Sequence, residues 1–532
     1  MSRIPVRDLA KFGVVQDADE TLIPPNAWTK ANNVRFRDGK IITSPGHIQA
    51  YEPPSIPPYW LMQVFSPNKD IAWIYAGLAK VYTYLSGNHT DISRTVGGAY
   101  TTTMNDLWNG GVLAGIPILN NGQDVPQYWA NIAPTTKLAN LINWPTTWRA
   151  SVVRPFKNFL IAMNMLESSV RYIHRVRWSS PAQPGGIPPS WDDTDPTQDA
   201  GITDLTDTES GSVVDGQSLG DVFMLYKERS IWSMQFVGGQ YKFNIKRIID
   251  QGGALAVNCI ASFGDPAKHC VFSGTDIYQH DGQTPTSMVS KQLRRWIMAN
   301  IDTANYRRAF VVSYADQNEL WICFPLNGSP WSNIAIIINT LDGSVFTRDL
   351  TNASYIANGV ALNDSVDTWD ADTLAWNADG VSWDSTLSQL FTRQLLQADP
   401  ILSHIYVMDQ TNAFNSVPFT CLLERTGLSL AGTDKGGNPI SDPDVRKLVK
   451  GIWVQARSGP ISITIGRVRE HDGPIAWGTP QSFQPGQNSY VGFLDDAPPL
   501  DARTFGIRFQ WQSNLPGLLD SYDLDIEALG EF

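Results

Sequence analysis

The feature that most constrains this chain is the repeated alternation of short apolar runs with tight-turn pairs. Asp-Gly or Asn-Gly pairs occur at residues 38–39, 121–122, 281–282, 327–328, 342–343 and 472–473. These pairs tolerate positive φ at both central positions, which two-residue β-hairpin turns require. In the run Ser332–Leu350, two β-branched segments flank the pair at 342–343. The sequence therefore predicts a mostly β protein built from hairpins.

The spacing of the strand-like runs indicates how the hairpins are arranged. Between residues 59 and 359 the runs recur with a period of roughly 40–50 residues. Four-stranded sheets repeated around an axis, as in a β-propeller, fit this period. A pair of β-sandwiches or barrels would give the same signals and is the alternative. Helical spacing of apolar residues is found at Val289–Ile301 and at Ser385–Gln397, where we expect helices.

A chain of 532 residues is too long for one ordinary hydrophobic core. We expect an N-terminal arm with the first strands over residues 1–58, a β-propeller-like domain over 59–402 and a C-terminal β-sandwich over 403–532. Polar insertion loops interrupt the propeller-like domain at about 179–221 and 364–385. The last part is set apart by polar hairpins and by the isoleucine alternation of residues 461–465.

Composition limits the class of function. The formal net charge is −12, and charged residues make up 17% of the chain. Such a chain lacks the clustered Lys and Arg that grip nucleic acid, although an acidic wall would let DNA slide past without sticking. The 19 Trp, 17 Tyr and 21 Phe predict large surfaces buried within the chain or between subunits. No apolar run approaches the ~20 residues of a membrane span, so we expect assembly in the cytoplasm.

Motifs that carry chemistry are missing from the sequence. There is no phosphate-binding glycine loop, no G-x-S-x-G elbow and no metal-type spacing of histidines, and the four cysteines are far apart. We therefore expect no catalytic residue, no cofactor and no metal. His280, beside the turn at 281–282, is predicted to have a turn or packing role. The polar loop with Asp192, Asp193, Asp195 and Asp199 offers calcium-type oxygens but misses the EF-hand spacing, so a solvated acidic loop is the simpler interpretation.

Two sets of residues are candidates for contacts with other molecules. Trp369, Trp376 and Trp383 stand seven residues apart, each followed by Asp or Asn, and Trp191 lies in the first insertion. Aromatic residues in polar loops often anchor interfaces, although they also form small local cores. The alternating arginines of the basic stretch 171–177 resemble the polar face of a strand, and we expect a solvated or intersubunit ion-pairing face and not phosphate contacts.

Several motifs resemble one family along nearly the whole chain. The opening carries P-V-R-D-L at residues 5–9, I-P-P-N-A-W at 23–28, N-V-R-F-R-D-G at 33–39 and P-G at 45–46. Further along stand LYKERSIWSMQFVGG, GTDIYQHDG, RRWIMANI and GIWVQARSGPISITIG. These motifs resemble the tail nozzle, or tail tube hub, proteins of short-tailed bacteriophages.

This resemblance implies a structural subunit in the tail of the virion. Members form a homo-oligomeric ring, a hexamer, below the portal and adaptor, and genomic DNA passes through its lumen. Fibres or spikes and a needle would attach to it. We expect Arg7, Asp8, Trp28, Arg35 and Phe36 to lie in an arm that contacts a neighbour. A tail-associated polysaccharide-degrading enzyme, which would need two carboxylates at a defined separation, and a receptor-binding module remain alternatives.

Overall fold

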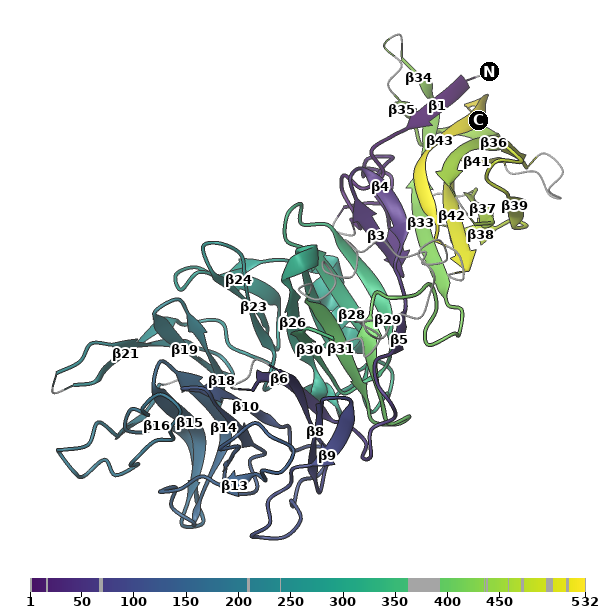
Figure 1. The fold of residues 1–532 in the computed structure, drawn as a ribbon. Helices are drawn as coiled ribbons and strands as arrows, with labels where there is room; N and C mark the ends of the chain where they lie inside the picture. Colours follow the sequence, from purple (N-terminus) through teal and green to yellow (C-terminus); the bar gives the residue numbers. More distant parts are fainter. Residues whose placement is uncertain are drawn as a thin grey trace.

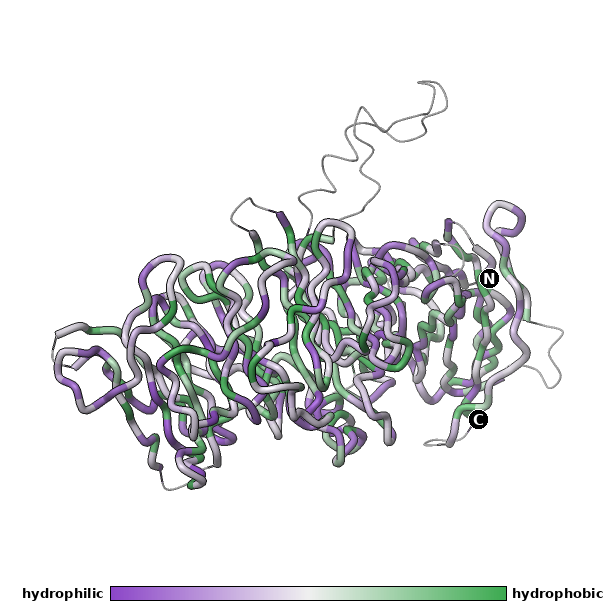
Figure 2. Tube along the Cα trace, turned by 60° about the horizontal axis from the view of Figure 1, so that its bottom comes forward, coloured by the Kyte–Doolittle hydropathy of each residue, from purple (hydrophilic) through white to green (hydrophobic). Residues whose placement is uncertain are grey.

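The computed structural model describes residues 2–15, 18–66, 70–207, 211–239, 241–361, 393–434, 436, 439–457, 459–469, 473–493, 501–512 and 516–531. This part of the chain is dominated by β-strands, as predicted. Its helices are α1 (Lys291–Asn300), inside the helix predicted from residue 289, and the short 3-10 turns η1 (Tyr306–Arg308) and η2 (Ala315–Gln317). Figures 1 and 2 show a long body with two parts at opposite ends.

One part is a β-propeller. Six separate four-stranded antiparallel sheets follow one another around an axis (Figure 1). The first three are β6 (Trp60–Phe65), β7 (Ile71–Ala76), β8 (Val81–Leu85) and β9 (Asn88–Asp91); β10 (Asn109–Leu113), β11 (Ile116–Asn120), β12 (Gln127–Tyr128) and β13 (Ala139–Asn140); and β14 (Trp148–Phe156), β15 (Phe159–Glu167), β16 (Val170–Trp178) and β17 (Gly201–Asp204). The others are β18 (Val213–Leu219), β19 (Val222–Lys227), β20 (Ile231–Phe236) and β21 (Phe243–Ile249); β22 (Ile260–Phe263), β23 (Lys268–Phe272), β24 (Ile277–His280) and β25 (Thr286–Ser287); and β30 (Tyr355–Gly359), β31 (Gln394–Asp399), β32 (His404–Met408) and β5 (His47–Gln49).

A further four-stranded meander lies between the last two of these sheets. It consists of β26 (Phe310–Tyr314), β27 (Glu319–Phe324), β28 (Ser332–Asn339) and β29 (Val345–Ala353). Its first strand contacts β22 on one side and β30 on the other, so it occupies a blade position in the ring. The repeated four-stranded sheets confirm the propeller and not the alternative of paired sandwiches.

The ring is closed by a strand that precedes the propeller in the sequence. β5 pairs antiparallel with β32, with His47 opposite Met408 and Gln49 opposite Tyr406. Residues far apart in the chain therefore complete the last blade, which ties the segment before the propeller to its end. β31 in this blade takes the place of the last four residues of the helix predicted over residues 385–397, because Leu395 and Leu396 are buried between neighbouring strands.

The other part is a β-sandwich to which both ends of the chain contribute. One sheet contains β1 (Ser2–Val6), β3 (Val34–Arg37), β4 (Lys40–Thr43), β43 (Leu518–Glu531), β36 (Val445–Arg457), β40 (Tyr490–Gly492) and β41 (Asp501–Ala502). The facing strands are β2 (Lys30–Asn32), β33 (Thr420–Leu428), β42 (Thr504–Gln512), β37 (Ile461–Val468), β38 (Ala476–Trp477) and β39 (Gln481–Phe483), and β34 (Leu430–Thr433) with β35 (Pro439–Ser441) forms a separate hairpin. Ile461, Ile463 and Ile465 all face the core, as their alternation predicted.

The strands of the N-terminal segment up to β4 are part of this sandwich, and β5 belongs to the propeller, so residues 1–58 do not form a separate arm. Trp28 is fully buried, its ring lies edge-on to Phe509 with centroids 6.2 Å apart, and its Nε1 donates to the Leu9 carbonyl at 2.8 Å. Phe36 is buried against Phe346. The expectation that these two side chains contact a neighbour is therefore wrong, because apolar residues of this segment fill the core of their own chain.

Arg7 and Asp8 are exposed, and Arg7 forms an ion pair with Asp523 on β43. Their contact with a neighbouring subunit stays a prediction. Arg425, which is buried, donates to the carbonyls of Glu20 and Ile23 at 2.9 Å each. This arginine fixes the connection between β1 and β2 to the sandwich.

A continuous sheet joins the propeller to the sandwich. β2 pairs in parallel with β29 and antiparallel with β33, so the blade β26–β29 and half of the sandwich form one ten-stranded sheet. Asn33, at φ 56°, donates through Nδ2 to Asp349 at 2.7 Å and to the Thr420 carbonyl at 2.8 Å. Asparagine tolerates this left-handed conformation better than most residues. It lets the chain leave β2 for β3 while its side chain holds both parts.

Buried charges reinforce the junction. Arg35 on β3 donates to Glu319 on β27 at 2.9 Å and to Asp409, which follows β32, at 2.7 Å. Arg348 on β29 donates to the second oxygen of Asp409 at 2.6 Å. The predicted neighbour contact of Arg35 is thus wrong, since its side chain is 4% exposed and lies between the sandwich and two blades.

The pKa values of this cluster follow from burial and charge. Burial alone would raise the pKa of Asp409, but the two guanidinium groups outweigh it and hold the pKa below its ordinary value. Burial also opposes the charge on Arg35, yet Asp409 and Glu319 raise its pKa. The nearby His47 has its pKa lowered to about 3 by burial and by Arg348, so it is neutral.

Replacing Arg35 should destabilise the protein strongly. Arg35→Met leaves Glu319 with one fewer cationic partner and keeps both carboxylates buried, so we expect a loss of about 3–5 kcal/mol in the free energy of unfolding. Chemical denaturation measures this loss. Arg37→Met on the same strand is the matched control, because Arg37 is exposed, and it should change the free energy by less than about 0.5 kcal/mol. Equal effects of the two variants would contradict the role assigned to the cluster.

Candidate functional site

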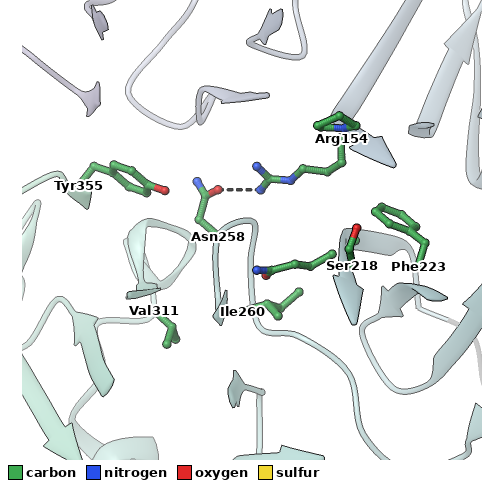
Figure 3. A pocket seen from close by; sticks show the side chains of 10 residues that line it. Arg154, Ser218, Phe223, Asn258, Ile260, Val311 and Tyr355 are labelled. Atoms are coloured by element: carbon green, nitrogen blue, oxygen red, sulfur yellow. Dashed lines mark hydrogen bonds between the residues drawn. The ribbon is translucent and has the colours of Figure 1, made fainter. Parts of the chain in front are cut away.

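The candidate site is a cavity of about 330 Å³ on the propeller axis (Figure 3). Inner strands of several blades converge there, so residues distant in sequence share one wall. The lining residues are Arg154, Pro155, Gly216, Gln217, Ser218, Phe223, Asn258, Ile260, Val311 and Tyr355. A cavity of this size lies at the lower end of the roughly 300–1,000 Å³ typical of small-molecule sites.

Arg154 is the charged group of the cavity wall, and it is held rigidly. Its Nε and Nη2 donate to the two carboxylate oxygens of Asp215 at 2.9 and 2.8 Å. Nη2 also donates to Asn258 Oδ1 at 2.7 Å, the contact drawn in Figure 3. Asp215 further accepts the backbone N–H groups of Gly216 and Asn258, each at 2.8 Å. The paired charges fix three blades to one another and leave this wall without net charge.

Asn258 and Tyr355 also line a second, smaller space, of about 10 Å³, together with Trp60, Trp108 and Arg308. A space of this size holds about one water molecule. Burial raises the pKa of Tyr355, against the opposing charge of Arg154, so its hydroxyl is neutral. The propeller therefore has a larger cavity and a much smaller space that share these two residues in their walls.

The wall can form hydrogen bonds but carries no acid–base pair. None of the ten lining residues is Asp, Glu or His, and the adjacent Asp215 is engaged with Arg154. A glycosidase uses two carboxylates that flank the scissile bond. The cavity thus does not provide the arrangement that the polysaccharide-degrading alternative requires at this position.

A buried histidine pair lies next to the cavity. Tyr226 Oη is 2.6 Å from His269 Nδ1 and 2.7 Å from His280 Nε2. The Gly282 backbone N–H donates to His280 Nδ1 at 3.1 Å, which confirms the turn role predicted for this histidine. His280 Nε2–H then donates to Tyr226, whose hydroxyl donates to His269 Nδ1. This assignment leaves His269 Nε2–H to donate to the carbonyl of the lining residue Ser218 at 3.0 Å.

Both imidazoles are neutral in this arrangement. Burial lowers the pKa of His269 to about 4. Burial, together with the nearby His269, lowers the pKa of His280 to about 4 as well. A protonated imidazole has no nitrogen that can accept a hydrogen bond. Protonating either ring would therefore remove one hydrogen bond from the chain that links blades β18–β21 and β22–β25.

The structure separates the residues singled out from sequence. Trp191 is 3% exposed and packs edge-on against Trp144 with ring centroids 4.7 Å apart. Its expected role as an interaction anchor is wrong, because the first insertion folds over its own small core. Trp369, Trp376 and Trp383 lie outside the described residues. The basic stretch forms ion pairs within the chain, and not the expected solvated or intersubunit face, with Arg175 bonded to Glu167 and Asp204 and Arg177 to Glu167 and Asp193.

The acidic loop is occupied by internal contacts. Asp193 pairs with Arg177 and Asp199 with Lys242, whereas Asp192 and Asp195 accept bonds from threonines two residues ahead. Across the described ranges no group of three or more potential metal-ligating side chains gathers. No helix in these ranges has the length and apolar character needed to cross a membrane.

Comparisons with known proteins add little to this geometry. No family model matches the chain, and no curated protein matches it significantly. Among solved structures, the WD40 β-propeller domain of Doa1 is 10% identical, covers 69% of this chain and 97% of its own length, and has a TM-score of 0.36. A fungal alcohol oxidase of the AA5 family in complex with copper is 9% identical over 89% and 98%, with a TM-score of 0.37.

A putative 6-phosphogluconolactonase from Bacteroides fragilis is 10% identical over 72% of this chain and 93% of its own, with a TM-score of 0.36. Similarities at this level carry no argument about function. The propeller follows from the strand pairing of this chain itself.

The histidine pair predicts acid sensitivity. The pKa values of the two histidines in the folded protein lie near 4, below the ordinary 6.5. Between pH 4 and pH 6.5 the unfolded chain therefore binds more protons than the folded protein. The stability from these groups is complete above pH 6.5 and is lost as the pH falls toward 4. The denaturation midpoint should therefore drop across this range.

The double variant His269→Gln/His280→Gln should have a lower midpoint at pH 7 but a flatter pH dependence. Tyr226→Phe is the control, because it removes the central hydroxyl and keeps both titrating rings, so the slope should persist. A double variant as steep as the wild type would contradict this account.

Proposed function

We propose that this protein is a structural, ring-forming subunit of a short phage tail, of the tail nozzle type. The sequence motifs listed above support this function, since they resemble that family from the N-terminal P-V-R-D-L to the C-terminal GIWVQARSGPISITIG. The proposal includes a virion location, with the portal and adaptor above and fibres or spikes and a needle as further partners.

The observation that carries the proposal is the stiff connection between the two parts of the molecule. A ten-stranded sheet runs from a propeller blade into the sandwich, and buried ion pairs of Arg35 and Arg348 with Asp409 clamp the same junction. A hinge would allow the parts to move independently, as is usual for domains joined by linkers. A stiff two-part body instead suits a building block that repeats by rotation, because heterologous contacts close into a ring only when the angle between neighbours is fixed.

In the proposed ring, DNA passes between subunits and not along the axis of a single propeller. Side chains from the inner strands, among them Arg154, Asn258 and Tyr355, gather where the blades converge, which argues against a duplex threading through a single propeller. The lumen of the proposed ring is instead bounded by the outer surfaces of several copies. The net charge of −12 suits such a wall, since phosphates are repelled and not captured.

The mass of the assembled protein tests the proposal. Native mass spectrometry of the purified protein, alone and with its adaptor, should show a closed ring of identical subunits, with six as the expected number. Labelled protein should also appear at the tail in virion images. A protein that stays monomeric under both conditions and is missing from virions would overturn the proposal, and release of sugar from host polysaccharide by the purified chain would favour the enzyme alternative.

The tryptophans of the second insertion provide a separate test. Replacing Trp369, Trp376 and Trp383 together with Ala should impair ring assembly or fibre attachment more than folding, because interface aromatics contribute to association more than to the monomer. Assembly is measured by sedimentation velocity and folding by the thermal midpoint. The matched control is Trp191→Ala, which should lower the midpoint because Trp191 is a core residue. Unfolding of the triple variant would show that these residues form a local core instead.

A further inference from the structure

The axial cavity presents three polar atoms that no residue of the described chain engages. The Nε2 of Gln217 donates to Ser262 Oγ at 3.0 Å, which leaves its Oε1 as a free acceptor. The Oδ1 of Asn258 accepts from Arg154, which leaves its Nδ2 as a free donor. The hydroxyl of Ser218 can both donate and accept. All three residues line the same cavity.

The charge of the wall limits the ligand. Arg154 is the only charged residue among the lining residues, and Asp215 neutralises it through two bonds at 2.9 and 2.8 Å. A further anion would have to compete with a fixed carboxylate for the same guanidinium. A cation would meet that guanidinium without a lining carboxylate of its own. A neutral ligand encounters neither penalty.

The apolar residues of the wall contribute less to it than the polar groups. Phe223, Ile260 and Val311 border the cavity but are themselves buried, with Phe223 beside Ser218 in Figure 3. The surface that a ligand meets is therefore mostly polar, and placed donors and acceptors fix the orientation of a ligand in such a site. Donors and acceptors in near-equal number match hydroxyl groups, each of which both donates and accepts.

We propose that the axial cavity of the propeller binds a neutral, hydroxyl-rich molecule of about monosaccharide size. Gln217, Ser218 and Asn258 form its hydrogen bonds. Arg154 positions Asn258 and does not bind the ligand as an ion. This site is independent of ring assembly, so either proposal stands if the other fails.

Ligand-observed saturation-transfer NMR on the full-length protein tests the site, with glucose and galactose as neutral probes and glucuronate and inorganic phosphate as charged ones. The neutral sugars should show transfer, and the charged probes should not. Val311→Phe adds a ring to the cavity wall and should abolish the transfer. Gln217→Ala removes one hydrogen-bonding group and should weaken binding about three- to tenfold.

Gln235→Ala is the matched control, because it makes the same chemical change at an exposed position of β20 and should leave binding unchanged. The thermal midpoint of each variant shows that it is folded. Transfer that is missing for both sugars, that is stronger for the charged probes, or that persists unchanged in both cavity variants would overturn the proposal.

Discussion

The structure depends on the buried charges at the junction between propeller and sandwich. Four ionised side chains share one interior site, and each has at least one partner of opposite sign within 2.9 Å. Removing such groups from water costs free energy that well-packed apolar residues would not require. The charges contribute directional bonds. One carboxylate oxygen of Asp409 bonds to Arg35 of the sandwich, and the other bonds to Arg348 of a propeller blade. Apolar packing alone tolerates sliding at an interface, whereas these bonds define one orientation.

The local features of the fold could be predicted from sequence because their signals are short in range. The turn Asp38-Gly39 has positive φ at both positions, 51° and 75°, and joins β3 to β4. The pair at 342–343 likewise lies between β28 and β29, and the apolar spacing before residue 301 marks α1. In each case the residues that form the pattern also form the element, so no distant partner is needed to interpret it.

The features that sequence could not predict depend on partners hundreds of residues away. β5 has three residues and exists because β32 offers it an edge, and β2 exists between β29 and β33. The segment after residue 393 has helical spacing, yet its residues are buried and form β31, which lies between β30 and β32 in the sheet. The candidate site is similar: Arg154, Asp215 and Asn258 come from three blades, and none stands in a motif. Only the positive φ of Asn258, 67°, marks a special position, and φ is not visible in sequence.

The side chains where the inner strands converge bear on the stiffness of the propeller. An open channel needs small or solvated residues there, but here the ion pair of Arg154 with Asp215 and the aromatic ring of Tyr355 lie at the cavity wall. The bonds from Arg154 to Asp215 and Asn258 join blades that local hairpin pairing leaves unconnected. These bonds therefore stiffen the propeller against relative rotation of its blades. The same residues leave a cavity on one side, so the rigidity of the building block and the proposed ligand site have one physical origin.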